Sequence, residues 1–169
     1  YNESIPAKIS NLFFYHCNFN TCRVNTNFMK KKFNQISTSS GFLKNNGGLL
    51  FRKIKTDRFE FKTKIKKIHL NKAKITHGGY ICSIIDAGAG TSAHYSANQK
   101  PCVTISLEIK FIAPTRCNDE IIGTVSINKK TKSLVFLSCV LKSKNKIIAT
   151  SSGIWKIINN KIPGAGSGG

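Results

Sequence analysis

The sequence predicts an α+β fold in which an antiparallel sheet wraps around one long central helix. Three observations support this prediction. The chain has a single long helical segment, that segment is apolar on nearly every side, and strand-like alternation precedes and follows it. A length of 169 residues with 40% hydrophobic residues suits one domain of ordinary size.

The domain is expected to cover residues 41–158. The preceding residues, 1–40, are rich in Asn, Ser and Lys and nearly acid-free, which predicts a disordered or transit-like leader. The following residues, 159–169, are rich in Gly and Ser and predict a flexible tail. The basic leader leaves the localisation open between a mitochondrion or plastid and the cytoplasm.

A pair of strands is expected at the start of the domain. In residues 59–65, Phe, Thr and Ile alternate with charged side chains. This alternation predicts a half-buried strand, with one face on the core and one face in solvent. The alternation then shifts its phase to Ile68 and Leu70. This shift predicts a bulge near Lys66–Lys67.

The central helix is predicted from Gly78 to about Tyr95. Its apolar positions follow helical spacing at Ile81, Ile84, Ile85 and Gly88. Small residues between Gly88 and Ala93 would allow a sheet to approach closely. A helix buried on most of its sides explains why the segment is apolar nearly all round.

Four strands are expected after the helix, as an antiparallel meander. Residues 103–111 alternate strictly between apolar and polar and end at Ala113-Pro114. The next strands are expected, in chain order, at 121–127, 134–141 and 147–158. The segment 134–141 is almost continuously apolar, which predicts a central strand. Strands in this order around one helix form the hotdog arrangement.

Asp86 is the strongest candidate for a functional residue. It is the only Asp, Glu, Lys or Arg between Ile75 and Gln99, in a chain with seven acidic residues. We expect it to be buried among apolar neighbours, where a carboxylate tends to have a raised pKa that suits a general base or nucleophile. Gly78 and Gly79 place backbone N–H groups at the helix start, where they could stabilise an oxyanion. Together these parts predict an acyl-transfer site.

The formal net charge of +20 invites a nucleic-acid function. The lysines are spread along the chain, however, and aromatic residues do not interleave with them as they do on a stacking surface. The charge therefore does not favour nucleic acid as the partner. It would equally attract an anionic substrate such as a phosphorylated acyl carrier.

The cysteines predict no metal site, and Cys17 and Cys22 could pair or react. They show no CxxC motif and no metal-ligand spacing, and occur at Cys17, Cys22, Cys82, Cys102, Cys117 and Cys139. Free thiols imply a reducing intracellular compartment. No segment approaches the roughly 18–20 consecutive apolar residues that a membrane span needs.

From about Phe42 to Ile158, the chain resembles the hotdog-fold acyl-CoA thioesterases of the phenylacetate-degradation and 4-hydroxybenzoyl-CoA type. The family pattern has an Asn six residues before a His-Gly-Gly motif and an Asp nine residues after the His. Asn71, His77-Gly78-Gly79 and Asp86 keep both spacings without a gap. Val103-Thr104 and Ala113-Pro114 follow in the order that the family shows.

This resemblance implies hydrolysis of an acyl-CoA thioester, in lipid metabolism and with no cofactor. Asp86 would act as general base or nucleophile, and the N–H groups of Gly78 and Gly79 would polarise the carbonyl. Asn71 would orient the water or the carbonyl, His77 would shape the loop, and Thr104 would contact the water. The resemblance also implies a site between two subunits, hence a homodimer or a tetramer of two dimers.

One position departs from the family pattern. Lys74 stands where these enzymes usually have Gly, at a position that prefers a positive φ angle. Three other interpretations remain: a hotdog dehydratase, whose catalytic His motif is not found, a non-catalytic acyl-CoA-binding protein, and a basic nucleic-acid-associated protein. The length of the acyl chain, and the choice between CoA and acyl carrier protein, stay open.

Overall fold

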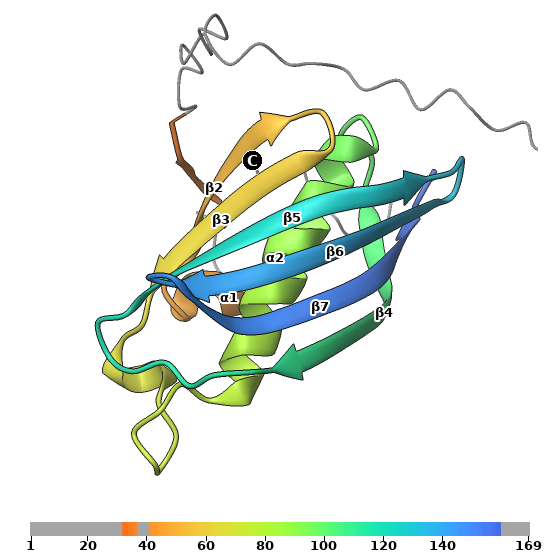
Figure 1. The fold of residues 1–169 in the computed structure, drawn as a ribbon. Coiled ribbons are helices and arrows are strands. Elements are labelled where there is room, and N and C mark those ends of the chain that lie inside the picture. Colours follow the sequence, from red (N-terminus) through yellow and green to blue (C-terminus); the bar gives the residue numbers. More distant parts are fainter. Residues whose placement is uncertain (1–31, 37–40, 160–169) are drawn as a thin grey trace, which may run out of the picture.

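The computed structural model describes residues 32–36 and 41–159, which form a seven-stranded sheet curved around one long helix (Figure 1). In chain order the elements are β1 (Asn34–Ile36), α1 (Phe42–Asn45), β2 (Leu49–Lys55), β3 (Arg58–Lys64), the 3₁₀ helix η1 (Lys67–His69), α2 (Gly78–Ser96), β4 (Cys102–Phe111), β5 (Glu120–Lys130), β6 (Leu134–Ser143) and β7 (Lys146–Ile157). The strands lie in the order β1-β2-β3-β5-β6-β7-β4, and every neighbouring pair is antiparallel. The α+β fold with one central helix is the predicted one.

The four strands after α2 occupy their predicted segments, but the expected meander of four consecutive neighbours is wrong, because β4 pairs with β7 at the sheet edge and β5 pairs with β3. β6 lies between β5 and β7, and its buried side chains alternate with half-buried ones.

Burial raises the pKa of Cys139 on this strand to about 12, so this thiol is inert. Cys82, Cys102, Cys117 and Cys139 are free thiols, whereas Cys17 and Cys22 lie outside the described residues.

The first strand pair differs from the prediction. β3 pairs with β2, a strand that the sequence analysis missed, and β2 in turn pairs with β1, which falls within the expected leader. The rest of the leader lies outside the described residues, as does the tail beyond residue 159. The predicted bulge near Lys66–Lys67 is also wrong: the chain leaves the sheet there and forms η1, which exposes Ile68 and buries His69.

Helix α2 packs on the concave face of the sheet with one side only. The residues that it buries include Ile81, Ile84, Ile85 and Ala89, whereas Asp86 on the opposite side is exposed. The expectation of a helix buried on most of its sides is therefore wrong for the single chain. Its outward side is rich in small residues and lacks Lys, Arg and Glu.

Two glycines set the distance between α2 and the sheet. The ring of Phe61 on β3 is fully buried and lies between Gly88 on α2 and Gly123 on β5. A Cβ atom added at Gly88 would lie 2.1 Å from the ring, and one added at Gly123 would lie 2.2 Å from it. No side chain fits at either position unless the ring moves.

Gly88→Ala should therefore lower the free energy of unfolding by about 1–3 kcal/mol, because overpacking displaces the Phe61 ring. Gly90→Ala on the same helix is the matched control, since its Cβ would lie 3.3 Å from Trp155. Gly90→Ala should lower the free energy of unfolding by less, because the helix propensity that alanine gains offsets this milder contact. Urea unfolding measures both variants. Combining Gly88→Ala with Phe61→Leu should recover part of the loss, and equal losses for the two alanine variants would contradict the packing argument.

Candidate active site

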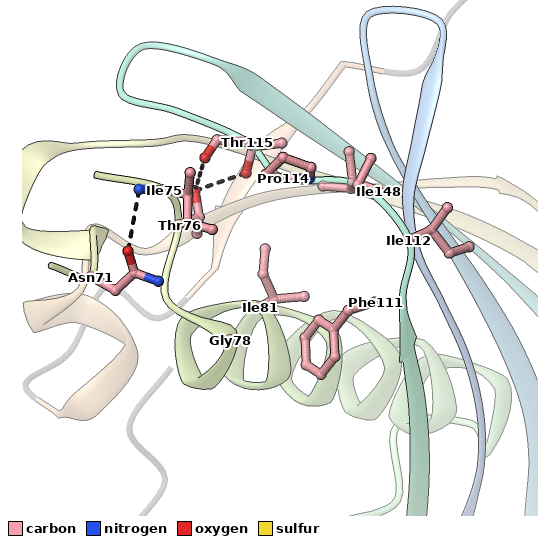
Figure 2. Close-up of a pocket in the computed structure, with 11 residues that line it drawn as sticks. Asn71, Ile75, Thr76, Gly78, Ile81, Phe111, Ile112, Pro114, Thr115 and Ile148 are labelled. Atoms are coloured by element: carbon pink, nitrogen blue, oxygen red, sulfur yellow. Dashed lines mark hydrogen bonds between the residues drawn. The ribbon is translucent and has the colours of Figure 1, made fainter. Parts of the chain in front are cut away.

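The loop that leads into α2 is closed by hydrogen bonds around Asn71. The Asn71 N–H donates to the carbonyl of Ile75 at 2.8 Å, and the Lys74 N–H donates to the carbonyl of Asn71 at 2.9 Å. The Asn71 side chain joins the loop through Oδ1, which accepts the Ile75 N–H at 3.3 Å. Its Nδ2 therefore points away from Ile75 (Figure 2). Asn71 thus both shapes the loop and keeps an amide donor available.

Lys74 adopts the left-handed conformation expected at its position, with a φ of 57°. A residue with a Cβ costs about 1 kcal/mol more than glycine in this region. The loop nevertheless closes with the backbone hydrogen bonds of Asn71 to Ile75 and of Lys74 to Asn71. The departure from glycine therefore affects the energy of the loop.

His77 caps the N-terminus of α2. Its Nδ1 accepts the N–H of Gly79 at 2.9 Å, and its own backbone N–H donates to the carbonyl of His69 at 2.8 Å. Gly79 therefore already has a hydrogen-bond partner. The N–H of Gly78 has none within the described part of the chain. Of the two glycines, Gly78 is the one with an open donor at the positive end of the helix dipole.

Gly78 lines a pocket of about 410 Å³ (Figure 2). The pocket is mostly apolar and lies between the start of α2 and the segment that follows β4. Its lining comprises Asn71, Ile75, Thr76, Gly78, Ile81, Phe111, Ile112, Ala113, Pro114, Thr115 and Ile148. Two threonines join its walls, since Thr115 Oγ1 donates to Thr76 Oγ1 at 2.7 Å and Thr76 Oγ1 donates to the Thr115 carbonyl at 3.2 Å.

Asp86 lies on the outward side of α2, where it is exposed in the single chain. The expectation of a buried carboxylate is thus wrong, because α2 turns this side away from the sheet. Thr104 Oγ1, on the edge strand β4, donates to Asp86 Oδ1 at 2.7 Å. Thr104 therefore fixes one carboxylate oxygen, and the other remains available to a ligand.

The predicted site residues form two separate groups in one chain. Asn71, His77, Gly78 and Gly79 surround the helix start, whereas Asp86 and Thr104 meet further along the helix. Asp86 follows Gly78 by eight residues, about 12 Å at 1.5 Å per residue. A single chain therefore holds the candidate residues in two separate groups.

A bulge in β4 lies beside the Asp86 group. The register between β4 and β7 shifts between Thr104 and Ser106, which leaves Ile105 without a pairing partner. Bulges of this kind re-aim neighbouring side chains on edge strands. The strict alternation of the sequence gave no signal for it, because a bulge inserts one residue without changing residue types.

His69 is a further residue of the site region that the sequence analysis missed. It is 2% exposed, stacks on Tyr80 with ring centroids 3.7 Å apart, and accepts the His77 N–H through its carbonyl. Burial lowers the pKa of His69, which keeps its Nδ1 able to accept the Lys66 N–H. Its ring Nε2 lies 3.1 Å from the Asn46 carbonyl. His69 thus holds the turn that carries the helix cap.

Residues 73–149 match the family model of the Thioesterase superfamily. The chain is similar to mouse acyl-coenzyme A thioesterase 13, with 30% identity over 88 residues, 51% of this chain and 63% of the mouse protein. The alignment thus spans less than two thirds of that relative's length.

Solved structures agree with the fold. Zebrafish thioesterase superfamily member 2 matches with a TM-score of 0.66 at 20% identity, over 72% of this chain and 89% of that chain. A hypothetical thioesterase protein from Streptococcus pneumoniae, solved with coenzyme A, matches with a TM-score of 0.61 at 13% identity, over 66% of this chain and 86% of that chain. The predicted hotdog arrangement is confirmed.

The φ angle of Lys74 leads to a test of the loop. Lys74→Gly should stabilise the protein by about 1 kcal/mol, because glycine adopts positive φ without strain, and should raise the Tm by roughly 2–4 °C. Lys72→Gly is the matched control, because Lys72 is an exposed lysine of the same loop without a positive φ. It should give no stabilisation. Thermal unfolding that ranks the two variants equally would refute the strain at Lys74.

Proposed function

We propose that this chain hydrolyses acyl-CoA to a free acid and CoA, because residues 73–149 match the family model of the Thioesterase superfamily and the chain is similar to an acyl-coenzyme A thioesterase. The observation that carries this proposal is the open N–H of Gly78 beside an apolar pocket, at the start of a long helix. A thioester carbonyl placed there would receive a hydrogen bond from the donor as its oxygen becomes negative.

The Gly78 group supplies the electrophilic half of the reaction. The carbonyl oxygen accepts the Gly78 N–H, and the Asn71 amide lies at the same pocket to orient the carbonyl or the attacking water. His77 contributes indirectly: it takes up the Gly79 N–H and so fixes the direction of the helix start. Such preorganised donors lower the barrier because they need no reorientation during the reaction.

The Asp86 group supplies the nucleophilic half. The Asp86 carboxylate takes a proton from water, the resulting hydroxide adds to the thioester carbon, and the C–S bond breaks. The CoA thiolate leaves and is protonated, which completes the hydrolysis. Direct attack by Asp86, followed by hydrolysis of the resulting anhydride, uses the same residues. Thr104 holds one carboxylate oxygen and so aims the other.

The two halves require a second copy of the chain. Asp86 and Gly78 of one chain lie about 12 Å apart along α2, so the carboxylate that meets Gly78 comes from the partner. The surface around Asp86 suits such contact. β4 is an edge strand with unpaired backbone groups, and it exposes Val103 and Ile105 beside the small side chains of α2. We therefore propose a homodimer, or a tetramer of two dimers.

Gly78→Pro tests the donor itself. Proline removes the N–H at the first helical position, which it tolerates, and the extended backbone of His77 suits a residue before proline. We expect kcat for acyl-CoA to fall about 10²–10³-fold. Gly78→Ala keeps the N–H, and its Cβ would lie 3.5 Å from the Phe111 ring, so it should retain most activity. Equal activity in the two variants would remove Gly78 from the mechanism.

Asp86→Asn tests the carboxylate and, in mixtures, the subunit arrangement. Alone it should lower kcat about 10²–10⁴-fold while the oligomer stays intact in size-exclusion chromatography. Thr91→Val on α2 is the control, because the Thr91 hydroxyl donates to its own helix at Ala87. Co-refolding Asp86→Asn chains with Gly78→Pro chains should restore about a quarter of the activity, since half of the dimers then hold one intact site of two. No recovery would place both groups in one chain.

A further inference from the structure

His69 contacts the start of α2 on both sides of Gly78. Its carbonyl accepts the N–H of His77, the residue before Gly78, at 2.8 Å. Its ring stacks on the ring of Tyr80, two residues after Gly78, with the centroids 3.7 Å apart and an angle of 13° between the ring planes. The residue that carries the open N–H is therefore flanked by two residues that His69 holds.

The hydrogen bonds of the His69 ring determine where its proton lies. Nδ1 accepts the backbone N–H of Lys66 at 3.1 Å, so this nitrogen carries no proton. Nε2 lies 3.1 Å from the backbone carbonyl of Asn46, which only accepts, so this nitrogen carries the proton. Only the neutral ring with its proton on Nε2 makes both hydrogen bonds at once.

Both hydrogen-bond partners of the ring belong to segments outside α2. Lys66 precedes η1, and its carbonyl accepts the His69 N–H at 3.0 Å, which closes that turn. Asn46 follows α1, and its side-chain amide donates to the carbonyl of Phe42 at 2.8 Å. The His69 ring thus ties the start of α2 to both η1 and α1.

The surroundings of His69 disfavour its charged form. Burial lowers the pKa of His69, the hydrogen bond to Asn46 opposes this shift, and the positive charge of Lys66 adds to it. The titratable group that faces the ring from α2 is Tyr80, whose hydroxyl lies 3.2 Å from Thr63 Oγ1 on β3. The pocket beside the ring also includes His77, and no carboxylate is among its lining residues in the described part of the chain.

A second proton on the ring would break its hydrogen bond to Lys66. It would occupy Nδ1 and face the Lys66 N–H, so that two donors would meet. The ring would have to move away from Lys66, and its stack on Tyr80 would move with it. The neutral ring is therefore the form that keeps the start of α2 in place.

We propose that neutral His69, with its proton on Nε2, is a positioning residue for the Gly78 donor. It acts through His77 and Tyr80, which fix the backbone that carries the Gly78 N–H. This inference rests on the proposed function and deepens it, because a misplacement of about 1 Å in a reacting group costs on the order of 10²-fold in rate. Acid then lowers turnover by protonating His69, in addition to any effect on Asp86.

Substitutions of His69 test this role at about pH 8, where the native ring is neutral. His69→Phe keeps a ring against Tyr80 and loses both ring hydrogen bonds, so kcat for acyl-CoA should fall about 10–10²-fold with little change in KM. His69→Gln keeps an amide donor for the Asn46 carbonyl and should lose only about two- to fivefold. His94→Gln is the matched control, because it removes a histidine from the last turn of the same helix and should leave kcat unchanged.

The pH profile separates positioning from a merely structural role. The folded pKa of His69 lies below the unfolded value of about 6.5, so what the neutral ring contributes is present above about pH 6.5 and is lost as the pH falls through the folded pKa. The kcat of the native protein should fall in the same range. This fall should be absent in His69→Gln, which does not ionise, and should persist in His94→Gln.

His77→Asn excludes the other histidine of the helix start. Asparagine does not ionise, and it keeps a side-chain acceptor for the Gly79 N–H. The acid fall in kcat should therefore persist in this variant. Far-UV circular dichroism at each pH shows that every variant is folded where its kcat is measured.

Two further measurements need no substrate. Nitrogen-15 NMR of the native protein should show the His69 ring with a protonated Nε2 and a bare Nδ1. Hydrogen exchange of the Gly78 and Gly79 amides should be faster in His69→Phe than in the native protein, and unchanged in His94→Gln.

The outcomes separate this inference from the proposed function. If no thioester is hydrolysed, the proposed function fails, and NMR and hydrogen exchange still decide whether His69 holds the start of α2. A neutral ring with its proton on Nδ1 would overturn the inference, as would native exchange rates or a native kcat in His69→Phe. So would an acid fall in kcat that His69→Gln leaves unchanged or that His77→Asn abolishes.

Discussion

The packing of the Phe61 ring between Gly88 and Gly123 is the contact on which the arrangement of this protein depends. It brings α2 close to the sheet and fixes the rotation of the helix about its axis. Rotation decides which residues face inward, and with Ile84 and Ile85 in the core, Asp86 must face outward. The exposed carboxylate is thus a consequence of core packing, and the two separate groups of one chain follow from it.

At the start of α2, one backbone N–H group is hydrogen-bonded and its neighbour is left open. The three residues His77, Gly78 and Gly79 lie in sequence, but the His77 ring takes up the Gly79 N–H and leaves the Gly78 N–H open. A helix N-terminus always has several such donors. Here the cap selects one of them, and the adjoining pocket is mostly apolar. This selection gives the donor its proposed role in polarising a thioester.

The fold brings part of the large positive charge together at one pocket. In the sequence the lysines are spread out, and several of them lie on solvated strand faces, where each contributes little. At the turn between β6 and β7, however, two of them meet Arg116 from another segment at one pocket. The left-handed conformation of Lys144 costs energy locally, as does that of Lys74. In this way a diffuse composition becomes a local basic surface.

The sequence by itself determined the fold class, the central helix, the interior position of β6 and the positive φ of Lys74, because each depends on periodicity or local steric preference. It also placed Asn71, His77 and Gly78 together, since they are neighbours along the chain. It missed β2. It also misread the phase shift near Lys66 as a bulge, because a 3₁₀ turn and a bulge change the alternation of side chains in the same way. Only the tertiary structure decided that Asp86 is exposed, that Thr104 holds it, and that Gly79 is already bonded. These facts depend on helix rotation and on contacts between distant segments, which residue spacing along one chain does not encode.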